Sequence, residues 1–292
     1  MSESTGPSRR DAIKTAAAGV LGALSVSGAS ARADDKEAPK VKGNIKQSVC
    51  RWCYNKIPLE TLATEAKKMG FKSIDLLSPD EYLKVKPLGL TCAMISGITS
   101  INDCLNRKDQ HERCEALARK LIDFAAAEGL PNVICFSGNR KGMADDEGLE
   151  NCAIGIERFI KYAEEKKVTI AMELLNSKVN HPDYMCDHTA WGVKLCKRVG
   201  SERFKLLYDI YHMQIMEGDV IATLKANKDY IAHYHTGGVP GRAEIDDSQE
   251  LNYPAIMKAI LETGYQGYVA QEFIPKREPL VSLQQSFTIC DV

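Results

Sequence analysis

Short apolar segments of strand length alternate along the chain with longer segments of helical periodicity. Eight apolar runs are found, at residues 45–53, 71–77, 90–97, 131–138, 168–175, 204–212, 230–237 and 268–273. Between them, apolar residues recur three or four positions apart, as in 59–69, and glycines such as Gly70 and Gly129 stand where helices would end. Near-continuous apolar strands between amphipathic helices are typical of a parallel sheet covered by helices on its outer side.

Eight strand–helix units in about 250 residues predict that the sheet closes into a (β/α)8 TIM barrel, an α/β fold. Helices are expected near residues 59–69, 78–87, 108–128, 147–166, 188–199, 217–227, 254–263 and 279–289. The 292 residues of the chain are enough for one such barrel and a short extension. We therefore expect a single barrel domain at 45–292, preceded by a charged linker at 34–44 that contains proline and glycine.

The first 33 residues differ from the rest in composition. Arg9 and Arg10 begin a segment that resembles the twin-arginine export pattern, and an Ala-, Gly- and Ser-rich stretch follows at 16–31. Ala31-Arg32-Ala33 matches a small-x-small cleavage site, and the apolar stretch is too short and weak to serve as a membrane anchor. Residues 1–33 thus predict a twin-arginine-type signal peptide and a periplasmic protein. The alternative is an unused leader and a cytoplasmic protein.

Charge and cysteine content favour a globular protein that binds small molecules. The formal net charge is −1, which offers no basic surface for nucleic acid or an anionic membrane. The ten cysteines stand mostly in apolar contexts, so we expect buried thiols. Cys50 and Cys53 form a CxxC run without a second such pair, which argues against a zinc or redox motif. A homo-oligomer is compatible with this type of barrel.

Four of the apolar runs carry a carboxylate or an imidazole near their ends: Glu173, Asp209, His235 and Glu272. The carboxyl ends of parallel barrel strands meet at one rim, where active sites are built. Alone, each residue could be a helix cap or a hydrogen-bonded core residue. Together, three carboxylates and one imidazole predict a site for Mg²⁺ or Mn²⁺, with Co²⁺ or Zn²⁺ as alternatives. His233, on the same run as His235, is expected to face the outer helices.

Several motifs resemble the xylose-isomerase-like TIM barrels, also called the sugar-phosphate isomerase/epimerase superfamily. These motifs are SGNR at 137–140, AMELLN around Glu173, YDIYHMQ at 208–214, VPGR at 239–242, ELNY at 250–253 and QEF around Glu272. The resemblance covers nearly all of the chain after residue 44 and is greatest to the hydroxypyruvate isomerases of this superfamily. The YDIYHMQ and VPGR motifs are fairly specific, whereas the single glutamates are not.

The resemblance implies roles for the four strand-end residues. Glu173 and Glu272 correspond to the paired catalytic carboxylates, which are also metal ligands. Asp209 and His235 correspond to the other two ligands. Hydroxypyruvate isomerases often have glutamine at the position of His235, whereas related ketose epimerases have histidine. This departure leaves the metal site intact and widens the choice of substrates.

Three further residues are expected to contact the substrate. By resemblance, His212 lies beside the metal or the substrate, and Arg242 reaches the far end of the substrate, where its guanidinium can hold a carboxylate. Trp52, at the end of the first apolar run, is expected to form an apolar wall of the pocket. Core packing is the alternative for this tryptophan.

Polar residues after the fourth and fifth runs are weaker candidates for substrate contacts. Asn139 and Arg140 follow the fourth run, and Lys178, His181 and His188 follow the fifth. Of these, we predict Asn139 and Lys178 as substrate-binding residues. Solvated loop positions are the alternative for each of them.

The chemistry of the four strand-end residues fits an aldose–ketose isomerase without an organic cofactor. Such an enzyme moves a proton between the two carbons of a hydroxy-carbonyl group through an enediolate, which a divalent metal stabilises. Glu173 and Glu272 can act as base and acid. The resemblance implies interconversion of hydroxypyruvate and tartronate semialdehyde. The alternatives are a ketose 3-epimerase or other sugar or polyol epimerase or dehydratase of the superfamily, and a non-catalytic exported sugar-binding barrel. A DNA-repair hydrolase would need more histidine ligands and a basic groove.

Overall fold

The computed structural model describes residues 41–98 and 100–292, which contain a sheet of seven parallel strands in the order β2-β1-β7-β6-β5-β4-β3. The strands are β1 (Lys46–Cys50), β2 (Ser73–Asp75), β3 (Asn132–Cys135), β4 (Thr169–Glu173), β5 (Phe204–Asp209), β6 (Ile231–Thr236) and β7 (Tyr268–Gln271). The predicted signal peptide and most of the predicted linker lie outside the described residues.

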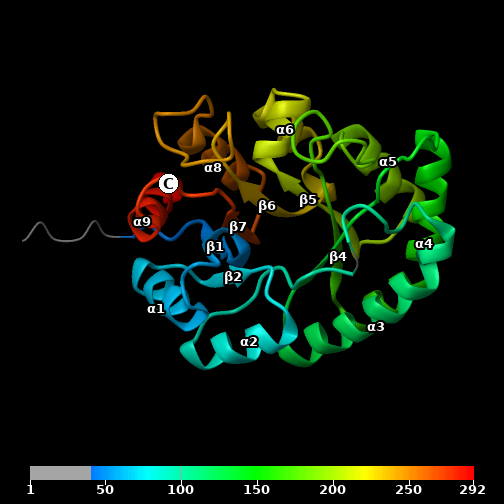
Figure 1. Cartoon of the computed structure of the whole chain (residues 1–292), viewed down its shortest axis with the longest axis horizontal. Helices are drawn as coiled ribbons and strands as arrows, with labels where there is room; N and C mark the ends of the chain where they lie inside the picture. The colour runs from blue at the N-terminus through cyan, green and yellow to red at the C-terminus, as the bar shows by residue number, and fades with distance from the viewer. Residues whose placement is uncertain (1–40, 99) are drawn as a thin grey trace, which may run out of the picture. The chain divides into compact units, whose positions relative to one another are not determined.

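The helices lie around the outside of the strands (Figure 1). The α-helices are α1 (Leu59–Met69), α2 (Pro79–Val85), α3 (His111–Glu128), α4 (Asp145–Lys166), α5 (Thr189–Val199), α6 (Ile210–Met216), α7 (Val220–Ala226), α8 (Tyr253–Glu262) and α9 (Pro279–Cys290). Short 3-10 helices are η1 (Arg51–Tyr54), η2 (Lys86–Leu88), η3 (Lys108–Gln110) and η4 (Lys228–Tyr230). The α/β TIM-barrel fold expected from the sequence is confirmed.

The segment predicted as a strand at 90–97 joins β2 to β3 without forming a regular strand. Thr91 pairs with Ser73, and Ile95 pairs with both Leu77 and Val133, through isolated parallel bridges. These bridges close the sheet into a barrel. The prediction of eight regular strands is therefore wrong in this segment, although the segment occupies the expected place.

Side chains satisfy the backbone groups of Ala93, where the pairing of this segment is interrupted. The Ala93 amide donates to the Ser73 hydroxyl at 2.7 Å, and the Asn132 side-chain amide donates to the Ala93 carbonyl at 2.8 Å. Because Ala93 is fully buried, its backbone groups require such partners. The chain can therefore leave strand geometry here without a buried unpaired amide.

The run predicted as a strand at 204–212 changes to a helix at its centre. β5 ends at Asp209, and α6 begins at Ile210. The Asp209 carboxylate accepts a hydrogen bond from the His212 amide at 3.0 Å, as a helix N-cap residue does. The capped turn fixes Asp209 at the carboxyl end of its strand and places His212 just above it.

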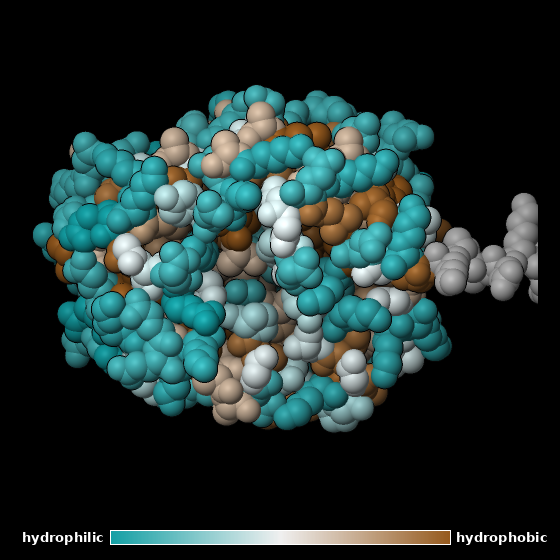
Figure 2. Space-filling view, turned by 180° about the vertical axis from the view of Figure 1, so that it is seen from behind, coloured by the Kyte–Doolittle hydropathy of each residue, from teal (hydrophilic) through white to brown (hydrophobic). Residues whose placement is uncertain are grey.

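Apolar strands and helix faces form one core around the sheet; nine of the ten cysteines are buried, and eight of these lie in that core. Cys53 is partly buried, so the expectation of buried thiols is confirmed for all the others. Hydrophilic residues cover most of the face seen in Figure 2, with hydrophobic residues visible in separate areas between them. Within residues 41–98 and 100–292, no helix has the length and hydropathy needed to cross a membrane.

Candidate functional site

The four strand-end residues predicted as metal ligands converge inside one rim of the barrel. Glu173 ends β4, Asp209 ends β5, His235 lies in β6 and Glu272 directly follows β7. These four strands are neighbours in the sheet. One possible ligand atom of each residue lies within 4.8 Å of those of the other three, and none of the side chains is more than slightly exposed.

The contacts among these residues leave two ligand atoms without hydrogen bonds. His235 Nδ1 lies 2.6 Å from Glu272 Oε2 and 3.3 Å from Glu173 Oε1. Neither His235 Nδ1 nor Glu173 Oε1 makes a hydrogen bond to any part of the described chain. Buried polar atoms normally have partners, so these two atoms are placed as ligands of an ion would be.

The charges of the site also fit a divalent cation. Burial, and then the negative charge of Glu272, raises the pKa of Glu173. Burial likewise raises the pKa of Asp209 well above its usual range, against the opposing effect of Arg242. A bound cation would offset this crowding of carboxylates. Three carboxylates with one imidazole suit Mg²⁺ or Mn²⁺ better than a structural zinc ion.

Glu272 is held by two donors that Glu173 lacks. The Trp52 indole donates to Glu272 Oε1 at 2.6 Å, and Arg242 Nη2 donates to Oε2 at 2.7 Å. Burial tends to raise the pKa of Glu272, but His235 and Arg242 outweigh it and hold that pKa well below its usual range. Glu272 is therefore a fixed anion.

Arg242 connects the carboxylates to the aromatic wall of the site. Its Nη2 also donates to Asp209 Oδ2 at 3.1 Å, and its guanidinium lies over the rings of Trp52 and Tyr211 at 5.1 and 5.3 Å. Nη1 makes no hydrogen bond within residues 41–98 and 100–292, although Arg242 lines the cavity described below. One edge of the guanidinium is thus available to a ligand.

The His212 imidazole lies next to the Asp209 carboxylate. Its Nδ1 accepts a hydrogen bond from the Asn176 amide at 3.1 Å, and its Nε2 lies 3.7 Å from Asp209 Oδ2. Burial, and then the positive charge of Arg242, lowers the pKa of His212 well below its usual range. His212 is therefore a neutral imidazole that carries its proton on Nε2, toward the site.

A cavity of about 470 Å³ opens onto this cluster. Glu173, Glu272 and Arg242 line it, together with Trp52 and His181. Its apolar wall comprises Leu76, Ile101, Ile134, Phe136 and Leu175. The volume is in the range of small-molecule sites. The place of Trp52 agrees with the predicted pocket wall.

Lys178 and Asn139, predicted from the sequence to bind substrate, do not line this cavity. Lys178 Nζ donates to the carbonyls of Ile215 and Met216 at 3.1 and 3.0 Å, at the end of α6. The Asn139 carbonyl accepts from the side chain of Asn106 at 2.8 Å. Among the basic residues after β4, His181 takes the cavity position, because the loop turns back toward the barrel there.

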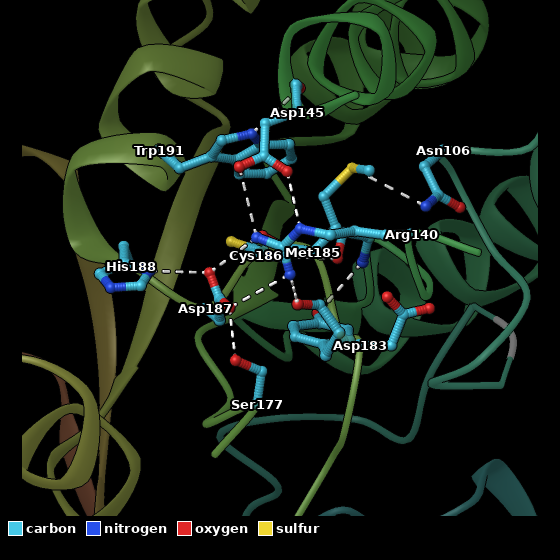
Figure 3. A network of polar contacts seen from close by, with 12 residues as sticks. Asn106, Arg140, Asp145, Ser177, Asp183, Met185, Cys186, Asp187, His188 and Trp191 are labelled. Atoms are coloured by element: carbon cyan, nitrogen blue, oxygen red, sulfur yellow. Dashed lines mark hydrogen bonds and ion pairs between the residues drawn. The ribbon is translucent and has the colours of Figure 1, made fainter. Parts of the chain in front are cut away.

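Arg140 anchors the loop 174–188 that carries His181 (Figure 3). Its guanidinium donates to both oxygens of Asp187, each at 3.1 Å, and to Asp145 Oδ1 at 2.7 Å. Ser177 also donates to Asp187, at 2.6 Å. Arg140 therefore joins the start of α4 to the end of the loop at Asp187, and Ser177 joins Asp187 to the beginning of the loop.

A second polar cluster lies behind His235, deeper in the barrel. His233 Nε2 lies 2.6 Å from Asp75 Oδ2, and both residues are fully buried. The rings of His233 and His235 are 5.2 Å apart. The prediction that His233 faces the outer helices is wrong, because residues two positions apart in a strand share one face.

Asp75 was missed as a candidate functional residue in the sequence. Burial tends to raise its pKa, but the charges of His233 and His235 outweigh this effect and lower the pKa. Its carboxylate within the apolar run 71–77 was the available signal, since Glu173 and Asp209 also stand within apolar runs. The barrel interior thus contains a fourth buried carboxylate.

Comparisons with known proteins agree with this architecture. The sequence pattern of the family described as "Xylose isomerase-like TIM barrel" matches residues 63–287. The 2-oxo-tetronate isomerase of Cupriavidus necator is 36% identical over 128 residues, 44% of this chain and 47% of that relative. The hydroxypyruvate isomerase of Escherichia coli is 27% identical over 232 residues, 73% of this chain and 86% of that relative.

A solved structure supports the fold. The AP endonuclease, family 2, from Brucella melitensis superposes with a TM-score of 0.71 at 23% identity, covering 82% of this chain and 97% of that one. At this identity, the likeness concerns the fold alone. Because the family pattern spans most of the described barrel, the chain belongs to the xylose isomerase-like TIM barrel family.

Proposed function

We propose that this protein is a metal-dependent isomerase that moves a proton between the two carbons of a hydroxy-carbonyl group. Hydroxypyruvate is the first substrate to test. The convergence of Glu173, Asp209, His235 and Glu272, with both glutamates lining a cavity, carries this proposal. The names of the relatives, hydroxypyruvate isomerase and 2-oxo-tetronate isomerase, support the same reaction class.

The same four residues would hold Mg²⁺ or Mn²⁺ through carboxylate oxygens and His235 Nδ1. When bound, the metal supplies positive charge that stabilises the negative charge formed on the substrate as its carbon loses a proton. Arg242 would orient the substrate, because its Nη1 edge is available to a carboxylate. The Nε2–H group of His212 stands beside Asp209 and would donate a hydrogen bond to a substrate oxygen without giving up its proton.

Glu173 is the better placed of the two glutamates to take the proton first. Its Oε1 makes no hydrogen bond in the described residues, and burial raises its pKa toward the range of an effective general base. Glu272 accepts hydrogen bonds from Trp52 and Arg242. Its first role is therefore to provide a negative charge in a fixed orientation. Returning the proton to the neighbouring carbon completes the isomerisation.

A ketose epimerase is the second candidate, favoured by the cavity. A volume of about 470 Å³ with an apolar wall that includes Ile101, Ile134 and Phe136 leaves room beyond a three-carbon acid. An epimerase returns the proton to the carbon it left, on the opposite face. An isomerase returns it to the neighbouring carbon, so the position of the proton separates the two functions.

Proton exchange in D₂O tests both candidates. The purified protein is stripped with a chelator, reloaded with Mn²⁺ or Mg²⁺, and incubated with hydroxypyruvate, 2-oxo-tetronate and a series of ketoses. Deuterium on the neighbouring carbon supports the isomerase, and deuterium on the original carbon with inverted configuration supports the epimerase. A metal-loaded protein that binds these compounds without incorporating deuterium would be a sugar-binding barrel.

The variant Glu173→Gln tests whether Glu173 is the general base. It keeps the shape of the side chain and removes its ability to accept a proton, so turnover and deuterium incorporation should both be lost. Thermal unfolding and circular dichroism check that the variant is folded. Retained turnover in a folded Glu173→Gln protein contradicts the role of Glu173.

A further inference from the structure

We propose that Asp75 is a positioning residue for His235, which keeps the proton of that imidazole on Nε2 so that the Nδ1 lone pair faces the metal site. This inference rests on the metal site of the proposed function. It concerns how the histidine ligand is prepared, and it does not depend on which substrate is used.

The two nitrogens of His235 face two different groups of side chains. Nδ1 points to Glu272 and Glu173, at 2.6 and 3.3 Å. Nε2 points to Cys50 Sγ at 3.7 Å and Asp75 Oδ2 at 3.9 Å. A neutral imidazole carries one proton, and the group that faces the other nitrogen of a metal ligand decides where that proton lies.

One oxygen of the Asp75 carboxylate faces both imidazoles. Its Oδ1 accepts hydrogen bonds from Ser48 at 2.5 Å and Ser73 at 3.0 Å. Its Oδ2 lies 2.6 Å from His233 Nε2 and 3.9 Å from His235 Nε2, so this oxygen stands between the two rings. Because all of these side chains are buried, the negative charge acts on both imidazoles with little screening by water.

The Cys50 thiol cannot by itself keep the proton of His235 on Nε2. Burial raises the pKa of the Cys50 thiol well above its usual range, so the thiol is neutral. A neutral thiol is a weak donor and a weak acceptor, and it favours neither nitrogen strongly. The carboxylate of Asp75 is the only anion in the described chain that faces Nε2 of His235.

The alternative is that Asp75 serves only as a structural partner of His233. The variants Asp75→Asn and His233→Gln separate these roles. Asp75→Asn keeps the shape and removes the charge behind His235, so the protein should bind Mn²⁺ at least tenfold more weakly. His233→Gln keeps the charge and a donor to Asp75, so its Mn²⁺ affinity should stay within about threefold of the parent.

The experiment measures the Mn²⁺ dissociation constant of the full chain by competition with a chromophoric chelator. The Nε2 proton of His235 is followed by NMR in the Mg²⁺-loaded protein, where a hydrogen-bonded N–H gives a downfield signal. Thermal unfolding shows that each variant is folded. Loss of affinity in Asp75→Asn alone, with an upfield shift or loss of the N–H signal, supports the inference.

Equal Mn²⁺ affinities of the parent protein and Asp75→Asn overturn the inference about Asp75. Equal losses of Mn²⁺ affinity in Asp75→Asn and His233→Gln overturn it as well. A proton on Nδ1 in the parent protein also overturns it, even if Asp75→Asn fails to fold. The proposed reaction is judged separately. A parent protein that binds Mn²⁺ but isomerises and epimerises nothing contradicts the proposed function, while the affinity comparison still decides the role of Asp75.

Discussion

Glu173 and Glu272 carry the same side chain in opposite electrostatic environments. Glu173 has a raised pKa and an oxygen without a hydrogen bond, whereas Glu272 has a lowered pKa and accepts from Trp52 and Arg242. Two carboxylates whose environments separate their pKa values can divide the work of proton transfer and charge stabilisation. The sequence alone shows two strand-end glutamates and cannot distinguish them, since the difference comes from residues 220 and 30 positions away.

Trp52→Phe tests how far this asymmetry depends on the indole. The substitution removes the donor to Glu272 and keeps an aromatic ring beneath Arg242. Losing a hydrogen bond to a charged group costs about 1.5–3 kcal/mol, so kcat/KM should fall by about tenfold or more. Steady-state kinetics on the best substrate of the D₂O screen measure the loss. Unchanged kinetics would mean that Arg242 alone holds Glu272.

The side of the strand on which His233 lies was predicted wrongly from the sequence. His233 and His235 are two positions apart, and the strand period places both toward the barrel interior. Consequently Asp75, His233 and His235 form one buried group. The convergence of the four strand-end residues was recognisable, because each stands at or near the end of an apolar run and parallel strands end on one rim.

At the scale of elements, helix ends were easier to predict than strand ends. Gly70 and Gly129 lie directly after α1 and α3 with positive φ, as the sequence predicts. The run 204–212 remains apolar beyond β5, so only the capping contact of Asp209 reveals that a helix starts there. Side-chain hydrogen bonds at Ala93 likewise replace a strand that hydrophobicity alone predicts.

The loop 174–188 is the element whose anchoring matters most for the cavity. Arg140→Gln removes the bidentate contact to Asp187 and the contact to Asp145. Because the contact is partly buried, the loss should cost about 2 kcal/mol. Limited proteolysis should then cut within 174–188 faster, and KM should rise more than kcat falls, since His181 lines the cavity. Unchanged cleavage and KM would show that Ser177 and the loop backbone suffice.

The contact between Arg140 and Asp187 also predicts that the stability of the fold depends on pH. Burial tends to raise the pKa of Asp187, but hydrogen bonds from Arg140, Ser177 and His188 outweigh it and lower the pKa. A carboxylate with a lowered folded-state pKa stabilises the fold above its unfolded pKa of about 4, and this stabilisation is lost as pH falls through the folded value.

The difference in Tm between the parent protein and Arg140→Gln should therefore be constant from pH 7 down to about 5 and shrink below about 4. Thermal unfolding of both proteins across this range gives the comparison. The matched control is Arg158→Gln, which removes an exposed contact to Glu115 and leaves the loop untouched. A difference that grows in acid contradicts the ionised state of Asp187.

For the whole molecule, the alternation of strands and helices was enough to predict the barrel, because few folds accommodate so many parallel strand–helix units. The cavity was not predictable, since its wall gathers residues from segments as distant as Trp52, Ile134 and Arg242. Export through residues 1–33 and a homo-oligomeric state stay predictions. Periplasmic export would place the proposed reaction outside the cytoplasm and so favours substrates available there.

Metal binding should stabilise the whole barrel, because the four ligands come from four neighbouring strands. Mn²⁺ at 100 times its dissociation constant adds about 2.7 kcal/mol to the free energy of unfolding. For a chain of this size that corresponds to a rise in Tm of roughly 5 °C or more. Thermal unfolding of the chelator-treated protein during a Mn²⁺ titration measures this rise.

Asp209→Asn is the matched control for this measurement. Asparagine caps helices as well as aspartate does, so α6 should keep its start while the site loses one charged ligand. The Mn²⁺-dependent rise in Tm should then shrink to a small fraction of that of the parent. An equal rise in both proteins would place the stabilising ion elsewhere, and no rise in the parent would contradict a metal site at this rim.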